Sequence, residues 1–356
     1  MAEALGLVAP GRPLREGLER ILLAERGALL VIGDDAKVLS ICTGGFLIDA
    51  EFSPQRLTEL AKMDGAIILS ADAGRIARAN VHLMPSPSVA TTETGTRHRT
   101  AERVARSIDV PVLSVSAAMG VITVYRRDEK HVLRAAARLH DQVSQALQAL
   151  QRFRRRFDLA VTALSALEIE DTVTLHDVAA VLAPSEIMMR VARELEPVFI
   201  ELGEDGRLLR LQLAELTEGV EPVRELVVRD YVRAAKPKSD GAPPRREPDV
   251  IAALSALSTE ELRDGAKVGA ALGLPKHESE LDSSLEPRGY RLLYRLPRFP
   301  DALVDRIVEH FAGLQKIMRA SVGDLEEVGG VGEARARSVK EGLSHLAEAS
   351  ILDRYS

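Results

Sequence analysis

Two short stretches of the sequence carry side chains that could handle a phosphorylated substrate. In the first, Asp64 and Gly65 precede the aliphatic run Ile67–Leu69. In the second, about thirty residues on, Gly95–Thr100 reads Gly-Thr-Arg-His-Arg-Thr. A carboxylate at the start of a strand, beside a cationic turn at the start of a helix, could hold a nucleoside triphosphate, because a helix N-terminus and guanidinium groups both favour phosphate.

Each stretch taken alone has a simpler explanation. Asp and Gly are favoured in any turn between a helix and a strand, and Asp264–Ala266 repeats the Asp-Gly-Ala tripeptide in a charged stretch with no aliphatic strand after it. Arg97–Arg99 alone would be typical of a solvated basic loop, and His98 alone of a surface residue. The site prediction therefore depends on the combination and its spacing.

The elements that position these residues are predicted from apolar spacing and turn residues. Thr100 is expected to cap a helix over Ala101–Ile108, which puts Arg97, His98 and Arg99 just before the helix. Strands and helices interleave, so we predict an α/β domain with a mixed central sheet flanked by helices. The other predicted helices are 14–24 and 54–63, and the predicted strands are 28–32, 38–42 (in a hairpin with 28–32), 66–70, 75–83, 111–116 and 121–125.

Length and composition suggest several domains in a soluble cytoplasmic protein. The chain has 356 residues, a net charge of −6 and one cysteine, Cys42, which excludes an intramolecular disulfide. Residues 1–23 do not resemble a signal peptide, and no apolar run has the length of about 20 residues that a membrane span needs. We predict an α/β domain over 1–138, an all-α spine over 139–285 and a third domain over 286–356.

The predicted spine begins with a long amphipathic helix, whose apolar residues from Val143 to Leu164 recur at three-four spacing. This helix could pack only in the core of its own domain, or it could also pack between subunits. We favour the second alternative. Pro184 is expected to split the next helical region, and 236–249 is expected to be an irregular linker. Gly203–Gly206 is compatible with either a helical turn or a hairpin.

The chain ends with a stretch typical of a helix-hairpin-helix DNA-binding motif. Gly330, Val331 and Gly332 separate two helical segments, and such glycines let backbone N–H groups approach a DNA phosphate. Arg335 and Lys340 could add ionic contacts. Residues 294–300 and the helix after them could be a degenerate first copy. The alternative is a helical capping module with a glycine turn, and the region's balanced charge predicts weak, salt-sensitive binding.

The stretches Lys62–Leu69 and Gly95–Arg103 together resemble the diadenylate cyclase domain of the DNA integrity scanning protein family, and the resemblance extends over the whole chain. It implies condensation of two ATP into cyclic di-AMP with release of two pyrophosphates, by two domains that face each other. It implies that Asp64 activates the ribose 3′-hydroxyl. The further ATP-binding positions that it implies are Gly65, Leu83, Thr96, Arg97, His98, Arg99, Thr100 and Ser116.

A metal ion and an assembly are also expected. A free carboxylate is a weak base toward a ribose hydroxyl, so we expect Mg²⁺ or Mn²⁺ near Asp64 and His98, with catalytic roles for Arg97 and Arg99 as well. The resemblance implies an octamer of two stacked rings, and branched DNA such as Holliday junctions as a ligand that inhibits synthesis. Ala117–Met119 stands where some members carry arginines, so contacts from that run to the opposite nucleotide do not transfer.

Two other functions remain open from the sequence. The chain could be a DNA-binding scaffold whose nucleotide site only senses ATP, or it could be a simple ATP hydrolase. The Walker pattern Gly-x-x-x-x-Gly-Lys-Ser/Thr is absent, which disfavours a P-loop hydrolase. The products formed from ATP would distinguish the three.

Overall fold

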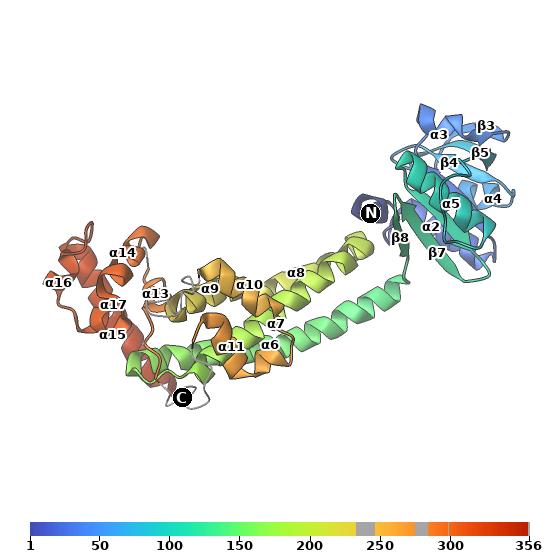
Figure 1. Ribbon diagram of the computed structural model, residues 1–356. Helices are drawn as coiled ribbons and strands as arrows, with labels where there is room; N and C mark the ends of the chain where they lie inside the picture. The colour runs from blue at the N-terminus through green and yellow to red at the C-terminus, as the bar shows by residue number, and fades with distance from the viewer. Residues whose placement is uncertain (233–245, 275–283, 298, 355–356) are drawn as a thin grey trace. The chain divides into compact units, whose positions relative to one another are not determined.

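The computed structural model describes residues 1–232, 246–274, 284–297 and 299–354 (Figure 1). The chain forms two compact units, one of residues 1–145 with 194–211 and one of residues 146–193 with 212–356. No helix among the described residues is both long and apolar enough to span a lipid bilayer. The predicted linker over 236–249 falls mostly outside the described residues.

The first unit is built on one eight-stranded sheet in the order β2-β5-β4-β1-β6-β7-β8, with β3 also paired to β5. β1 and β4 run parallel, while the other pairs are antiparallel. The predicted mixed sheet is therefore confirmed. The strands are β1 (Ala28–Ile32), β2 (Cys42–Thr43), β3 (Phe46–Glu51), β4 (Ala66–Leu69), β5 (Arg75–Leu83), β6 (Val112–Ser116), β7 (Val121–Arg126) and β8 (Glu129–Val132). Of these, β3 and β8 were not predicted.

Helices cover both faces of this sheet, because the central strands are apolar at every position and so present apolar side chains to both faces (Figure 1). In β1, Leu30 and Ile32 pack in one core with α1 (Ala2–Leu7), α2 (Pro13–Leu23) and α4 (Pro54–Leu60). Leu29 and Val31 pack in the other core with α3 (Ala36–Ser40) and α5 (Thr96–Ile108). A sheet buried on both faces explains why its central strands read as continuous apolar runs.

The predicted strand over Val38–Cys42 and its hairpin are wrong. Residues 36–40 form the short helix α3, because the Asp35 side chain accepts a hydrogen bond from the backbone N–H of Val38 and caps the turn. Strand β2 is limited to Cys42–Thr43, and it pairs with β5 instead of β1. A five-residue apolar run fits one turn of helix as well as a strand, and the cap decides between them.

Long helices follow the sheet. The predicted amphipathic helix is α6 (Ala136–Glu170), a single helix of 35 residues. The predicted break at Pro184 is wrong: α7 runs unbroken from Leu175 to Leu202. Leu182 and Met188, on either side of the proline, are fully buried, and we attribute the continuity to this packing, which offsets the lost backbone hydrogen bond. Gly203–Gly206 is the 3₁₀ turn η1.

The remaining helical elements have 12 residues or fewer, apart from one of 22 residues, α17. The 3₁₀ turn η2 spans Glu261–Arg263. The others are α8 (Arg207–Thr217), α9 (Val220–Tyr231), α10 (Glu247–Ala256), α11 (Gly265–Leu272), α13 (Tyr290–Leu293), α14 (Asp301–Phe311), α15 (Leu314–Arg319), α16 (Val322–Glu326) and α17 (Glu333–Arg354).

A buried carboxylate fastens the end of α7 to the sheet unit. Glu201 is 1% exposed and accepts hydrogen bonds from the backbone and side chain of Arg134, at 2.7–3.1 Å, and from Nε2 of His131 at 3.1 Å. Burial raises the pKa of Glu201, but these bonds outweigh burial and lower the pKa from 4.5 to about 2. Glu201 is therefore ionised throughout the neutral range.

This pairing predicts an acid-sensitive contribution to stability. A carboxyl group with a lowered pKa stabilises the folded state fully above its unfolded pKa, and the contribution is lost as the pH falls from about 4.5 toward 2. The free energy of unfolding of the first unit should fall in that window, as measured by urea titrations at a series of pH values. Glu201→Gln should flatten this dependence, whereas Glu196→Gln, at an exposed position of the same helix, should keep it.

The second unit contains a buried ionic cluster. Glu168 of α6 is fully buried and accepts hydrogen bonds from the guanidinium of Arg291 and from the hydroxyl of Tyr231. Asp230 accepts from three successive backbone N–H groups, of Gly289, Tyr290 and Arg291, at 2.6–2.9 Å. Burial, followed by the charge of Glu168, raises the pKa of Asp230 to about 7. The cluster fastens the start of α13 to α6 and α9.

Candidate active site

The two stretches singled out in the sequence meet at one pocket of the sheet unit, with a volume of about 880 Å³. This volume lies within the usual range for small-molecule sites. Its walls include Asp64, Gly65, Leu83, Thr96, Arg97, His98, Thr100 and Ser116, all of which were predicted. The walls also include residues that were not predicted, among them Gly27, Leu29, Val81, Val115, Ala117 and Ala118.

Helix α5 begins earlier than predicted. Its N-cap is Gly95, and Thr96 is its first residue, so Arg97, His98 and Arg99 lie in the first turn instead of in a preceding loop. Thr100 does not cap the helix, since its hydroxyl donates to the backbone carbonyl of Thr96 one turn back. No side chain caps this helix, so its first backbone N–H groups are free for an anion.

Asp64 and Arg97 form an ion pair across the pocket. Nη2 of Arg97 donates to Oδ1 of Asp64 at 2.7 Å, and the Asp64 side chain is 92% exposed. An exposed pair of this kind contributes at most about 1 kcal/mol. An incoming triphosphate can therefore compete for Arg97 at low cost, which would release the carboxylate of Asp64.

Two glycines are required by close packing at this site, Gly27 beside Arg97 and Gly65 beside Asn80. A Cβ at Gly27 would lie 2.5 Å from Nη1 of Arg97, so the guanidinium occupies the space that a side chain would take. A Cβ at Gly65 would lie 2.4 Å from the carbonyl carbon and 2.5 Å from the Cα of Asn80. Asn80 lies on β5 with a φ of +54°. Close packing of the backbone therefore requires glycine at position 65 even when no nucleotide is bound.

We expect Gly65→Ala to destabilise the protein even without a nucleotide. The added methyl group meets backbone, which cannot move aside as a side chain can, and overpacking of this kind costs about 1–3 kcal/mol. Urea denaturation of the nucleotide-free protein would measure the loss. The matched control is Gly95→Ala in the same pocket, where a Cβ would meet only Cδ2 of His98 at 3.6 Å. Equal stability of the two variants would contradict the packing argument.

His98 is the buried member of the site. It is 7% exposed, its Nδ1 lies 2.8 Å from the hydroxyl of Tyr125, and its Nε2 is buried without a hydrogen-bond partner among the described residues. Burial lowers the pKa of His98. The negative charge of Glu93 opposes this shift, and the positive charge of Lys130 adds to it. The imidazole is therefore neutral at pH 7. Burial also raises the pKa of Tyr125, and its bond to Glu93 adds to that shift.

The loop before α5 is held by side chains that the sequence did not single out. Glu102, 8% exposed, accepts from the hydroxyl of Thr91 and from the backbone N–H of Thr92. Glu93 accepts from the hydroxyl of Tyr125 at 3.0 Å and from Nζ of Lys130 at 2.5 Å. Burial raises the pKa of Glu93, but these two bonds outweigh burial and lower it. No sequence motif marks the pairings of Glu93, because they join the loop to strands β7 and β8, 32 and 37 residues further along the chain.

The pocket could share a divalent cation with a substrate but could not hold one alone. Among the described residues, no group of three or more His, Cys, Asp or Glu side chains is arranged to bind a metal. The carboxylate of Asp64 suits Mg²⁺ or Mn²⁺, and Mg²⁺ typically takes one or two protein carboxylates together with substrate phosphates. The unpartnered Nε2 of His98 is a nitrogen donor, which Mn²⁺ accepts more readily than Mg²⁺. The donor set therefore fits a cation that arrives with a triphosphate.

The described pocket lining differs from the prediction at Arg99. Arg99 is exposed on α5 and does not line the pocket, so the structure places only one of the two arginines there. Leu83 and Ser116 both line it, as expected. None of the described lining residues is Phe, Tyr or Trp. Apart from His82 and His98, the described lining consists of glycine, aliphatic and small polar residues together with Glu25, Asp64 and Arg97.

The predicted C-terminal hairpin lies between α16 and α17. Gly330 has a φ of +90°, which favours glycine, and a Cβ at Gly329 or Gly332 would meet nothing within 4 Å. Arg335 donates to the carbonyl of Gly330 at 2.9 Å. Val331 is buried, so only its backbone is available to a ligand.

Two basic side chains near this turn are placed differently from expectation. Lys340 is half-buried, and its Nζ donates to the backbone carbonyl of Met318 at 2.6 Å. Arg306 of α14, which the sequence did not single out, donates to the carbonyl of Gly329 at 2.8 Å. The exposed guanidinium groups at the turn are therefore those of Arg306 and Arg335.

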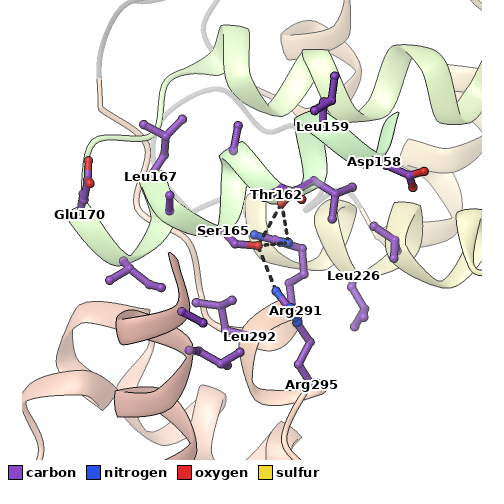
Figure 2. Close-up of a pocket in the computed structure, with 17 residues that line it drawn as sticks. Asp158, Leu159, Thr162, Ser165, Leu167, Glu170, Leu226, Arg291, Leu292 and Arg295 are labelled. Atoms are coloured by element: carbon purple, nitrogen blue, oxygen red, sulfur yellow. Dashed lines mark hydrogen bonds between the residues drawn. The ribbon is translucent and has the colours of Figure 1, made fainter. Parts of the chain in front are cut away.

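A second pocket, of about 780 Å³, lies in the helical unit between α6, α9, α13 and α17 (Figure 2). Its lining is mostly apolar. Figure 2 shows Arg291 and Arg295 together near Ser165, to which both donate hydrogen bonds, at 3.0 and 3.2 Å. Because Arg291 is neutralised by Glu168, this wall of the pocket belongs to the buried cluster described above.

Two family models and a solved structure are similar to parts of this chain. Residues 15–130 match the family model of the DisA bacterial checkpoint controller nucleotide-binding (DAC) domain, and residues 133–281 match that of the DisA bacterial checkpoint controller linker region. Among solved structures, a double mutant of DacA from Staphylococcus aureus aligns with 37% of this chain and 91% of that chain, at 21% identity and a TM-score of 0.29.

Full-length relatives are also similar. The DNA integrity scanning protein DisA of Streptomyces coelicolor is 52% identical over 100% of this chain and 94% of that protein. The protein of the same name from Parafrankia sp. is 51% identical over 99% of this chain and 96% of that protein. The one from Kineococcus radiotolerans is 50% identical over 100% of this chain and 97% of that protein. The chain, with its DAC nucleotide-binding domain and its linker region, therefore belongs to the family of DNA integrity scanning proteins, DisA.

Proposed function

We propose that the protein condenses two molecules of ATP into cyclic di-AMP and releases two pyrophosphates. The observation that carries the proposal is the single pocket where the carboxylate of Asp64, the guanidinium of Arg97 and the imidazole of His98 come together at the uncapped start of α5. Membership of a family with a DAC nucleotide-binding domain supports this choice over an ATP hydrolase or a scaffold that only senses ATP.

The residues of the pocket have distinct roles in this reaction. Attack on an α-phosphorus needs alignment and neutralised charge more than covalent help. The free N–H groups of α5 and Arg97 bind the triphosphate, and Arg97 leaves Asp64 as it does so. Asp64 then accepts the proton of the ribose 3′-hydroxyl as the 3′-oxygen bonds to the α-phosphorus of the second ATP, and the bond from that phosphorus to pyrophosphate breaks.

A divalent cation and a second subunit complete the proposal. When bound, Mg²⁺ or Mn²⁺ would lower the pKa of the attacking hydroxyl and orient the triphosphate, and Asp64 and His98 are the residues that would hold it. Two identical attacks on two identical substrates fit two pockets related by a two-fold axis. We therefore propose a homo-oligomer, an octamer by family resemblance, whose isolated monomer is inactive.

The products formed from ATP test this function directly. The protein is incubated with ATP and Mg²⁺ or Mn²⁺, and the mixture is separated by chromatography. Cyclic di-AMP with pyrophosphate would support the proposal. ADP and phosphate would favour a hydrolase, and unchanged ATP would favour the DNA-binding scaffold.

We also propose that the turn between α16 and α17 binds the phosphates of branched DNA, such as a Holliday junction. The open space at Gly329 and Gly332 and the exposed guanidinium groups of Arg306 and Arg335 support this role. Binding of a fluorescent four-way junction should weaken steeply as salt is raised from about 50 to 200 mM, in the manner of phosphate contacts. Arg335→Ala should weaken it further.

The proposed inhibition by DNA needs its own measurement. The rate of cyclic di-AMP synthesis is followed while the same junction is added at concentrations that saturate binding. A falling rate would support coupling between the two ends of the chain. A constant rate with bound junction would exclude it, without affecting the proposal for either site.

A further inference from the structure

The hydrogen bonds behind His98 run in one direction. Glu93 accepts from Nζ of Lys130 at 2.5 Å and from the hydroxyl of Tyr125 at 3.0 Å. A carboxylate held beside an ammonium is ionised and can only accept. The single phenolic proton of Tyr125 therefore points to Glu93, and the phenolic oxygen is left as an acceptor.

The ring of His98 must supply the donor for that oxygen. Its Nδ1 lies 2.8 Å from the hydroxyl oxygen of Tyr125, and two acceptors cannot form a hydrogen bond, so Nδ1 carries a proton. A second proton on Nε2 would leave a buried donor unpaired, because Nε2 has no hydrogen-bond partner among the described residues. The remaining form is the neutral Nδ1–H tautomer, with a lone pair on Nε2.

We propose that Tyr125 and Glu93 are positioning residues that hold His98 in the Nδ1–H tautomer, so that the lone pair of Nε2 is offered to the nucleotide or to the cation bound with it. The inference rests on the proposed function, because it assigns the partner of Nε2 to the ligand of this pocket. His98 lines that pocket, and a buried acceptor without a partner is the group that a ligand would satisfy.

Tyr125 and Glu93 do not line the pocket. Tyr125 is 1% exposed and packs with α5 in the sheet core. Its ring meets that of His98 edge to face, with centroids 6.1 Å apart. Tyr125 and Glu93 therefore act on the reaction only through the imidazole of His98. Residues that hydrogen-bond a ligand-binding histidine act in this way, because they fix its tautomer and the orientation of its ring.

Nitrogen NMR of the whole protein tests the tautomer without any substrate. Protonated and unprotonated ring nitrogens have well-separated ¹⁵N chemical shifts, and the chain has only eight histidines. Sedimented protein labelled with ¹⁵N-histidine is compared with His98→Gln to assign the signals of His98. The expected result is a proton on Nδ1 in the unchanged protein and a mixture of tautomers in Tyr125→Phe. A proton on Nε2 in the unchanged protein, or an unaltered tautomer in Tyr125→Phe, would overturn the proposal.

Kinetics separate positioning from simple structural support. Tyr125→Phe keeps the ring and should lower kcat for cyclic di-AMP by about 10–100-fold with a much smaller change in the KM for ATP, as is typical for partners behind a ligand. The matched control is Ser114→Ala in the adjacent strand β6, which removes a buried hydroxyl that has no partner among the described residues. It should leave both constants within about twofold.

The two proposals fail in different ways. If the unchanged protein makes no cyclic di-AMP, the cyclase function fails, and the NMR result still decides the tautomer. If the unchanged protein is active and Tyr125→Phe keeps the full kcat, the positioning role is wrong while the cyclase function stands.

Discussion

Asp64→Asn should lower the rate of cyclic di-AMP synthesis by about 10²–10⁴-fold, the usual loss when a general base is removed. The amide cannot accept the ribose proton, and it is a poorer ligand for Mg²⁺ or Mn²⁺. The fold should be unaffected, because the Asp64 side chain is 92% exposed and its pair with Arg97 is worth little. Rates from chromatography and urea denaturation curves, measured on the same preparations, would show this separation.

The matched control for this variant is Asp49→Asn. Asp49 is also an exposed aspartate paired with an arginine, Arg75, and it lies outside the pocket. It should keep the parental rate. Synthesis at the parental rate by Asp64→Asn would remove Asp64 from the mechanism, and a loss of the same size in both variants would point to a general effect of surface charge.

Glu168→Gln should be the most destabilising of the substitutions considered, at about 3–5 kcal/mol, because it removes the buried carboxylate that accepts hydrogen bonds from the guanidinium of Arg291. Glu168 is 0% exposed, and the Arg291 guanidinium that it neutralises belongs to a residue that is 2% exposed. The cost is far greater than that of losing a surface pair. The loss should appear in urea denaturation of the helical unit, and hydrogen exchange should show the start of α13 opening first.

Two comparisons make this prediction specific. Asp158→Asn breaks an exposed pair with Arg154 on the same helix α6 and should cost less than about 0.5 kcal/mol. The double variant Glu168→Leu with Arg291→Met removes both charges and should be more stable than Glu168→Gln. If Glu168→Gln costs no more than Asp158→Asn, the cluster does not fasten α13 to α6.

The sequence predicted the parts of the fold that depend on long patterns. Strands β1 and β4 were found because they are continuous aliphatic runs, and α6 because its apolar spacing persists over many turns. The errors fall where a short pattern has two solutions. Asp35 is compatible with a turn between two strands, but in the structure it caps α3. Pro184 is compatible with the end of a helix, but buried packing on both sides of it keeps α7 continuous.

The candidate site was predicted to a similar extent. Residues belonging to the two motifs could be named, because their types and spacing carry the chemistry. Gly27, Glu93 and Tyr125 could not, since each acts through a partner far away in the chain: Arg97, Lys130 and His98. The same limit applies to the first turn of α5, where Gly95 and Thr100 are both plausible caps and only the backbone path decides between them.

The described lining of the pocket lacks Phe, Tyr and Trp, and this bears on which nucleotides can enter it. Stacking of a base on an aromatic ring is worth roughly 1–3 kcal/mol, and adenine has no such ring among the described lining residues except the two imidazoles. Affinity should therefore reside in the triphosphate, so that GTP competes within about tenfold of ATP while adenosine binds far more weakly. Discrimination between purines would then arise after entry, according to which nucleotide brings its ribose into line for attack.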